Sequence, residues 1–248
     1  QDMSSVLKKI KKIIKSNVIF VCCSKGIEMN TLKLPSQIVA SYFPKHSIAV
    51  LSGPNFAEEV SRNMPTATLI ASNKITISKK IASIVQTKLF RPYVSDDVVG
   101  SQIAGATKNV YAIACGVVEG KKFGKNAVAS IISRSFAEVS RLNKSMRAKP
   151  ETLSGLSGMG DLFLTCSSKK SRNFKLGLDL ASGMSLSSII KKNSSIAEGV
   201  FTARALKQMS LKKKLNLPIA ETVYQILYRK KNIDHAIEEL LNRPIGRE

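Results

Sequence analysis

The sequence contains few of the residues that usually bind metals. Only two histidines occur, His46 and His235, and they are far apart with no HExxH spacing. The four cysteines form no CxxC pair: Cys22, Cys23, Cys115 and Cys166. Metal sites in proteins need such ligands at short, regular spacings. We therefore expect no metal site, and we expect reduced, largely buried thiols in a cytoplasmic protein.

Long apolar segments are also missing. The longest, residues 103–118, is interrupted by Lys108 and Asn109, and it is shorter than the roughly 20 apolar residues that cross a bilayer as a helix. Gln1 does not begin a signal peptide. The chain opens instead with an amphipathic pattern over residues 4–15, which needs a surface to pack on. We expect no membrane span.

Acidic residues are scarce: 17 Asp and Glu stand against 39 Lys and Arg, for a net charge of +22. Such an excess raises the question of a nucleic-acid partner. The basic residues, however, occur as scattered pairs and triplets without interleaved aromatic residues. We interpret them as solvated faces that attract small anionic substrates, and we expect no nucleic-acid partner. A basic nucleic-acid-binding module stays open as an alternative.

The first part of the chain alternates apolar runs with polar, glycine-containing turns. Residues 17–23 are predicted to form a buried strand, followed by a turn at Lys25-Gly26. Residues 47–51 are predicted to form a second strand, followed by a turn at Gly53-Pro54-Asn55. Ligands of parallel sheets bind beyond the carboxyl ends of the strands. These two turns are therefore expected to line one crevice, although ordinary turn chemistry would also explain them. Further elements are expected as strands over 67–71 and 90–95 and helices over 36–43, 56–62 and 76–89.

From Gly100 onward, helical periodicity dominates. Helices are expected over residues 101–118, 126–142, 172–182, 185–193, 200–214, 218–228 and 233–241. The predicted fold class is therefore α/β followed by all-α: a partial Rossmann-like parallel sheet with an α-helical C-terminal substrate domain. We place the boundary between residues 98 and 99.

Lys108 is the only charged residue in the segment 103–118. On a helix its neighbours three and four positions away are Ala104, Gly105, Tyr111 and Ala112, most of them too small to fill the space beside it. A lysine removed from water has a lowered pKa and becomes suited to general acid–base catalysis. The alternative is that Lys108 extends to solvent or pairs with a carboxylate.

A second polar stretch covers residues 152–173. Glycines at 155, 158 and 160 allow tight turns or close backbone contact, and they precede Asp161, which could simply cap a helix. Further on, Ser171-Arg172-Asn173 opens a helix, where backbone N–H groups and an arginine favour a bound phosphate.

Eight segments follow one another in the order and spacing of one enzyme family. They are SKGIE at 24–28, GPNFAEEV at 53–60, RPYVSDDVVG at 91–100, GATKNVYAIACG at 105–116, SGLSGMGDLFLTC at 154–166, SRN at 171–173, AEG at 197–199 and LLNRP at 240–244. Together they resemble the bacterial type of NAD(P)-dependent glycerol-3-phosphate dehydrogenase, and the similarity runs through essentially the whole chain.

The resemblance implies interconversion of sn-glycerol 3-phosphate and dihydroxyacetone phosphate with NAD or NADP, feeding glycerophospholipid synthesis. It implies Lys108 as the proton acceptor or donor and Asp161 as the residue that holds it, with Asn109 and Thr165 close by. Substrate-binding positions are Lys25, Gly53, Asn55, Lys108, Asp161, Ser171, Arg172 and Asn173. Cofactor-binding positions are Lys25, Ala57, Arg172, Ile196 and Glu198. A homodimer is expected.

Three departures from the family pattern stand out. No GxGxxG turn, which holds the cofactor pyrophosphate, occurs before SKGIE, so residues 1–98 are expected to be the C-terminal part of a dinucleotide-binding domain and 99–248 the substrate and catalytic domain. Asn55 stands where the family usually has Ser, and Gln102 where it often has Glu. An inactive truncated remnant or scaffold is the alternative that the missing turn favours.

Overall fold

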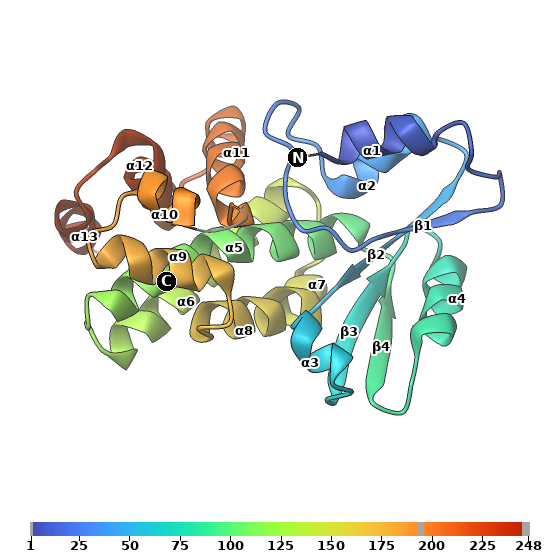
Figure 1. Ribbon diagram of the computed structural model, residues 1–248, viewed down its shortest axis with the longest axis horizontal. Coiled ribbons are helices and arrows are strands. Elements are labelled where there is room, and N and C mark those ends of the chain that lie inside the picture. Colours follow the sequence, from blue (N-terminus) through green and yellow to red (C-terminus); the bar gives the residue numbers. More distant parts are fainter. Residues whose placement is uncertain (1, 193–195, 245–248) are drawn as a thin grey trace.

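The computed structural model describes residues 2–192 and 196–244, and it divides into a small sheet with its covering helices and a larger helical part (Figure 1). The sheet has four strands: β1 (Ile19–Cys22), β2 (Ser47–Ser52), β3 (Thr66–Ala71) and β4 (Phe90–Ser95), in that spatial order. The prediction of strands at these four places is confirmed.

The predicted partial Rossmann-like parallel sheet is confirmed, with one antiparallel junction that the sequence did not predict. β1 pairs with β2 and β3 pairs with β4 in parallel, but β2 and β3 are antiparallel. Residues 53–65 connect β2 to β3 and contain the short helix α3 (Ala57–Ser61). This connection turns the chain back beside β2.

Helices cover both faces of the sheet. α1 (Met3–Ile10) and α2 (Pro35–Tyr42) pack on one face, where Leu7, Val39 and Phe43 are buried. α4 (Ile75–Val85) packs on the other face against Ala49 and Ile70. Both α1 and α4 end several residues before the predicted limits. Cys22, the last residue of β1, is buried, and Cys23, which follows the strand, is exposed.

The helical part is organised around α5 (Val98–Gly120), which is buried along most of its length. Because its side chains are small and apolar on all sides, other helices can pack all around it. The helices that contact it include α6 (Lys125–Ser145), α8 (Asp161–Ser167), α9 (Arg172–Ala181), α11 (Glu198–Lys213) and α12 (Pro218–Arg229). Two outer helices, α10 (Leu186–Lys192) and α13 (Ile233–Leu241), complete this part. The expected last residue of α10, at position 193, lies outside the described residues.

Two glycines let α5 and α9 cross in direct backbone contact. A Cβ atom at Gly116 would lie 2.0 Å from the carbonyl oxygen of Phe174, and one at Gly177 would lie 2.2 Å from that of Ile113. Neither distance is compatible with a side chain. This crossing brings the first turn of α9, with residues 171–173, beside Lys108 and Asn109 of α5.

Glu138 of α6 is a fully buried carboxylate that caps α12. Leu217, the N-cap residue of α12, has no side-chain acceptor, and Pro218 has no N–H. The Glu138 carboxylate accepts instead from the backbone N–H groups of Ile219 at 2.6 Å and Ala220 at 3.2 Å, and from the Tyr111 hydroxyl at 3.2 Å. Burial raises the pKa of Glu138 to about 7.

The sequence did not predict the helical course of residues 150–167. The structure has α7 (Pro150–Ser154), a π-helical turn over Leu156–Gly160 and then α8. Glycine usually interrupts helices, but here Gly158 is required for close contact, because its Cβ would lie 1.9 Å from the Leu153 carbonyl oxygen. None of the helices in residues 2–192 and 196–244 has the length and apolar character of a membrane span.

Candidate active site

Two lysines share the carboxylate of one buried aspartate. Lys108 Nζ lies 2.5 Å from Asp161 Oδ1, and Lys25 Nζ lies 2.5 Å from Asp161 Oδ2. Asp161 is 1% exposed and Lys108 8% exposed. Lys108 therefore pairs with a carboxylate and does not extend to solvent, and the Asp161 side chain binds lysines rather than capping its helix.

Three elements far apart in the sequence bring these groups together. Lys108 lies on α5, Asp161 begins α8 after the π-helical turn, and Lys25 follows β1. The space expected beside Lys108 at Gly105 is filled, because a Cβ atom there would lie 3.0 Å from Ser52 Oγ and 3.5 Å from Lys25 Cδ. The stem of Lys25 packs against α5 at this glycine. Lys25 Nζ also donates to the Gly53 carbonyl oxygen at 3.1 Å, which confirms that the turns after β1 and β2 adjoin.

The environment of Lys108 makes its neutral form more accessible than in an exposed lysine. Burial is the main cause that lowers its pKa to about 8, and the positive charge of Lys25 acts in the same direction, while Asp161 opposes both. A lysine that exchanges its proton near this pH can act as an acid or a base under physiological conditions.

The residues at the start of α9 have different roles in the structure. Ser171 is the N-cap, and its hydroxyl oxygen accepts from the Phe174 backbone N–H at 3.3 Å. Asn173 is buried and connects to Asn109 of α5 and Gly199 of α11. Arg172 is exposed at the edge of a cavity that Lys108 and Asn109 also line.

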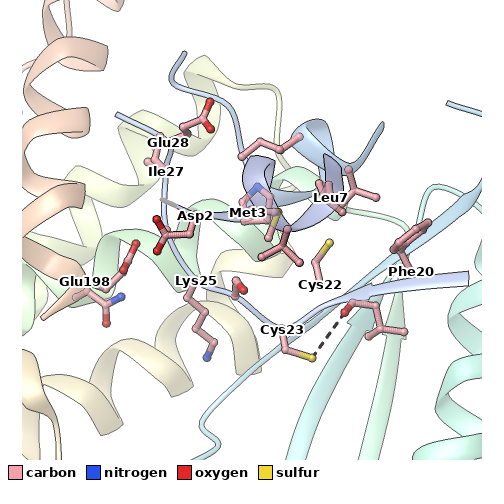
Figure 2. Close-up of a pocket in the computed structure, with 18 of the residues that line it drawn as sticks. Asp2, Met3, Leu7, Phe20, Cys22, Cys23, Lys25, Ile27, Glu28 and Glu198 are labelled. Carbon is pink, nitrogen blue, oxygen red and sulfur yellow. Dashed lines mark hydrogen bonds between the residues drawn. The ribbon is translucent and has the colours of Figure 1, made fainter. Parts of the chain in front are cut away.

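This cavity has a volume of about 740 Å³ and lies between the sheet part and the helical part (Figure 2). Figure 2 shows Lys25 on the segment that follows β1 and Glu198 on the side of the helical part. Gly26 faces Glu198 closely, since a Cβ there would lie 2.4 Å from Glu198 Oε1. Burial raises the pKa of Glu198, and Arg172 opposes this shift.

Other predicted site residues lie away from the cavity wall. The Asn55 amide lies 2.7 Å from Thr68 Oγ1 and is held against β3. Ala57 is exposed at the start of α3, and Ile196 is exposed beside a second cavity of about 170 Å³ that Arg172 also borders. Thr165 donates to the backbone oxygen of Asp161 at 2.7 Å. Ligand contacts for Asn55, Ala57 and Ile196, and for the other predicted site residues, stay predictions.

The residue-level analysis missed the contact between Lys25 and Asp161, which no local pattern reveals because the two residues meet only through the packing of distant elements. It also missed the role of Gly199, where a Cβ atom would lie 2.6 Å from the Asn109 backbone oxygen. Within residues 2–192 and 196–244 there is no group of three histidine, cysteine, aspartate or glutamate side chains that could hold a metal ion.

Comparison with known proteins agrees with this architecture. The family model described as NAD-dependent glycerol-3-phosphate dehydrogenase C-terminus matches residues 97–238, and the corresponding N-terminus model matches residues 1–78. The chain is 45% identical over its full length to glycerol-3-phosphate dehydrogenase [NAD(P)+] of Caulobacter vibrioides and covers 75% of that protein. It is 43% identical to the Parvibaculum lavamentivorans protein of the same name, of which it covers 74%.

A solved structure shows the same fold. Glycerol-3-phosphate dehydrogenase from Coxiella burnetii superposes with a TM-score of 0.93 at 33% identity, over 98% of this chain and 74% of that one. The two family models, the two relatives and this structure all lead to one assignment. The chain belongs to the NAD(P)-dependent glycerol-3-phosphate dehydrogenase family.

Proposed function

We propose that the chain interconverts dihydroxyacetone phosphate and sn-glycerol 3-phosphate, with hydride transfer between C2 and a nicotinamide cofactor. The observation that carries this proposal is the buried Lys108–Asp161–Lys25 cluster beside a cavity that an arginine also borders. Membership of the dehydrogenase family supports it. Glycerol 3-phosphate made in this way would supply glycerophospholipid synthesis.

Lys108 is the proposed acid and base. When C2 is reduced, the carbonyl oxygen gains negative charge, and a buried ammonium both stabilises that charge and donates the proton. In the oxidation, neutral Lys108 accepts the proton of the C2 hydroxyl. A pKa near 8 leaves both forms populated around neutral pH.

Asp161 holds the lysine in place. Its carboxylate fixes the position of the Lys108 nitrogen, and Lys25, bound to its other oxygen, adds positive charge beside the reacting oxygen. An aspartate with a single partner would be free to rotate, so the second lysine also fixes the carboxylate plane. Preorganised charge of this kind lowers the barrier because no reorganisation is needed during the reaction.

Arg172 at the start of α9 is proposed to bind the substrate phosphate, with Ser171 and Asn173 at the same helix end. A guanidinium offers several donors to phosphate oxygens, and the helix N-terminus adds a favourable field. Binding energy at the phosphate orients C2 with respect to Lys108.

We propose that the cavity receives the nicotinamide end of NAD or NADP. The close approach of Gly26 to Glu198 shows that these two walls meet without an intervening side chain, and Lys25, Arg172 and Glu198 line the cavity. We propose that these residues hold the cofactor, which supplies or accepts the hydride when bound. Residues 1–98 would form part of its binding domain and residues 99–248 the catalytic domain.

Purified protein should oxidise NADH or NADPH when dihydroxyacetone phosphate is added. The decrease in cofactor absorbance measures this reaction. Lys108→Met should abolish this turnover while the circular dichroism spectrum is retained. Absence of turnover by the wild-type protein with either cofactor would refute the proposed function.

A further inference from the structure

One side of helix α1 packs on the sheet part, and its exposed side is rich in lysine. Leu7 is buried, and Met3, Ile10 and Ile14 pack near it in the same apolar cluster. The helical course continues past the end of α1, since the backbone N–H of Ile14 donates to the Ile10 oxygen. The exposed side carries five lysines within eight residues, namely Lys8, Lys9, Lys11, Lys12 and Lys15.

These five lysines have no acidic partners. None of them forms an ion pair in the described part of the chain, whereas lysines of the helical part do, as Lys121 does with Asp234. Residues 3–57 contain one acidic residue, Glu28, and its carboxylate accepts from the Ser4 hydroxyl at the other end of α1. The positive charge at the end of α1 is therefore concentrated and not neutralised, which distinguishes it from the basic pairs elsewhere.

An exposed isoleucine lies beside these lysines. Ile13 is 75% exposed. It follows Lys9 by four positions, and Lys12 follows Lys8 by four positions, so these side chains occupy adjoining columns of the helix surface. Transfer of an isoleucine from water to an apolar phase is favourable, and flexible lysine stems can keep their ammonium groups in water beside it. Figure 1 shows α1 at the periphery of the sheet part, where an extended surface can reach it.

We propose that this lysine face of α1, made of Lys8, Lys9, Lys12 and Ile13, binds the surface of an anionic lipid bilayer. Its ammonium groups contact the lipid phosphates, and Ile13 enters the outer part of the acyl-chain region. A helix of this kind lies on the membrane and does not cross it. The residues of α1 that border the large cavity are others, among them Met3. The proposal is independent of the proposed function.

The composition of the lysine face favours a lipid surface over a nucleic acid. It contains no arginine, the residue that makes paired contacts with phosphates and bases. It also contains no aromatic side chain on which a base can stack. An exposed aliphatic side chain adds affinity for a bilayer, whereas affinity for a duplex comes mainly from charge.

Sedimentation of the purified chain with vesicles tests the proposal. Vesicles of phosphatidylcholine alone should not bind, and vesicles that contain about one third phosphatidylglycerol should bind. Binding should decrease strongly when the salt concentration rises from about 0.1 M to about 1 M, because the Debye length falls from about 10 Å to about 3 Å.

Variants of the lysine face have defined expected effects. The triple variant Lys8→Gln, Lys9→Gln and Lys12→Gln should weaken binding by roughly 100-fold, because each lysine near an anionic surface contributes a factor of about five. Ile13→Ser should weaken binding by roughly 10-fold through the lost apolar contact. Since all four side chains are exposed, the thermal midpoints should stay close to wild type. Lys12→Gln alone, with an expected factor of about five, replaces the triple variant if that variant does not fold.

The segment around α4, on the other face of the sheet, supplies matched controls. Lys79, Lys80 and Lys88 are exposed there, and Ile84 is 68% exposed four positions after Lys80. The triple variant Lys79→Gln, Lys80→Gln and Lys88→Gln removes the same charge as the α1 triple variant. Ile84→Ser removes the same apolar side chain as Ile13→Ser. Both controls should bind anionic vesicles within a factor of about three of wild type.

Four outcomes would overturn the proposal. A wild-type chain that does not bind the anionic vesicles would exclude a lipid partner. An equal loss of binding in the α1 and α4 triple variants would show that the total charge of the chain, and not the lysine face, causes the binding. Unchanged binding by Ile13→Ser would exclude its entry into the bilayer. Tighter binding of a DNA duplex than of the vesicles, lost in the α1 triple variant, would identify a nucleic acid as the partner.

Discussion

The buried carboxylate of Glu138 should make the stability of the fold depend on pH. Glu138 is 1% exposed, and Arg141 is the charged residue that acts on its pKa, in the lowering direction. Burial raises its pKa, while the N–H groups of Ile219 and Ala220 oppose the shift. A rise from 4.5 to about 7 corresponds to roughly 3 kcal/mol, at about 1.36 kcal/mol for each pH unit.

The sign follows from proton binding. Between pH 4.5 and 7 the folded chain keeps the Glu138 proton while the unfolded chain has lost it, so the folded state binds more protons. The free energy of unfolding therefore falls as the pH rises through this range and levels off above it. The stabilisation that protonated Glu138 gives the fold is complete at pH values below its pKa in the unfolded chain. It is lost as the pH rises past its pKa in the folded chain.

Urea unfolding of wild type and Glu138→Gln from pH 5 to 8 measures this effect. The amide cannot ionise but keeps one oxygen for the backbone N–H groups of α12, so the variant should lose most of the dependence, on the order of 3 kcal/mol. Glu58→Gln is the matched control, because Glu58 is exposed and pairs with Arg62 on the surface. Equal slopes in wild type and Glu138→Gln would refute the reasoning.

Three further predictions concern the site and the helix crossing. Arg172→Ala should raise KM for dihydroxyacetone phosphate by roughly 10- to 100-fold with a smaller change in kcat, since the contact exists in ground and transition states alike; an unchanged KM would contradict the phosphate role. Lys25→Met should move the pH profile of glycerol 3-phosphate oxidation to higher pH, because Lys25 lowers the pKa of Lys108, and a profile that stays in place would exclude this coupling. Gly177→Ala should destabilise the fold by about 1–3 kcal/mol or more, while Gly160→Ala, whose Cβ would meet nothing nearer than 3.6 Å, should cost less; equal thermal midpoints would argue against the close crossing.

The sequence predicted those features that depend on local pattern. Apolar, β-branched runs gave all four strands, and the small residues around Lys108 indicated a buried lysine beside Gly105. The eight family motifs carried the choice of Asp161 as its partner. The boundary at residue 98 and the expected homodimer stay predictions.

Features that depend on how distant elements pack could not be read from pattern. The antiparallel pairing of β2 and β3 depends on the path of the connection over residues 53–65, which only the folded chain reveals. The π-helical turn over Leu156–Gly160 was not predicted, because its glycines usually interrupt helices. Glu138 looked like an ordinary helix residue because its partners, the N–H groups of α12, follow it by about 80 positions.

The role of Lys108 is tested most directly by kcat of Lys108→Met, measured for glycerol 3-phosphate oxidation across the pH range around the Lys108 pKa of about 8. Lys88→Met, which alters an exposed lysine, is the control. We predict a loss of at least about 100-fold in kcat, the lower range for a general acid or base, together with loss of the pH dependence that wild type shows near that pKa. A kcat close to wild type with the same pH profile would contradict the assignment of Lys108 as the group that exchanges the proton.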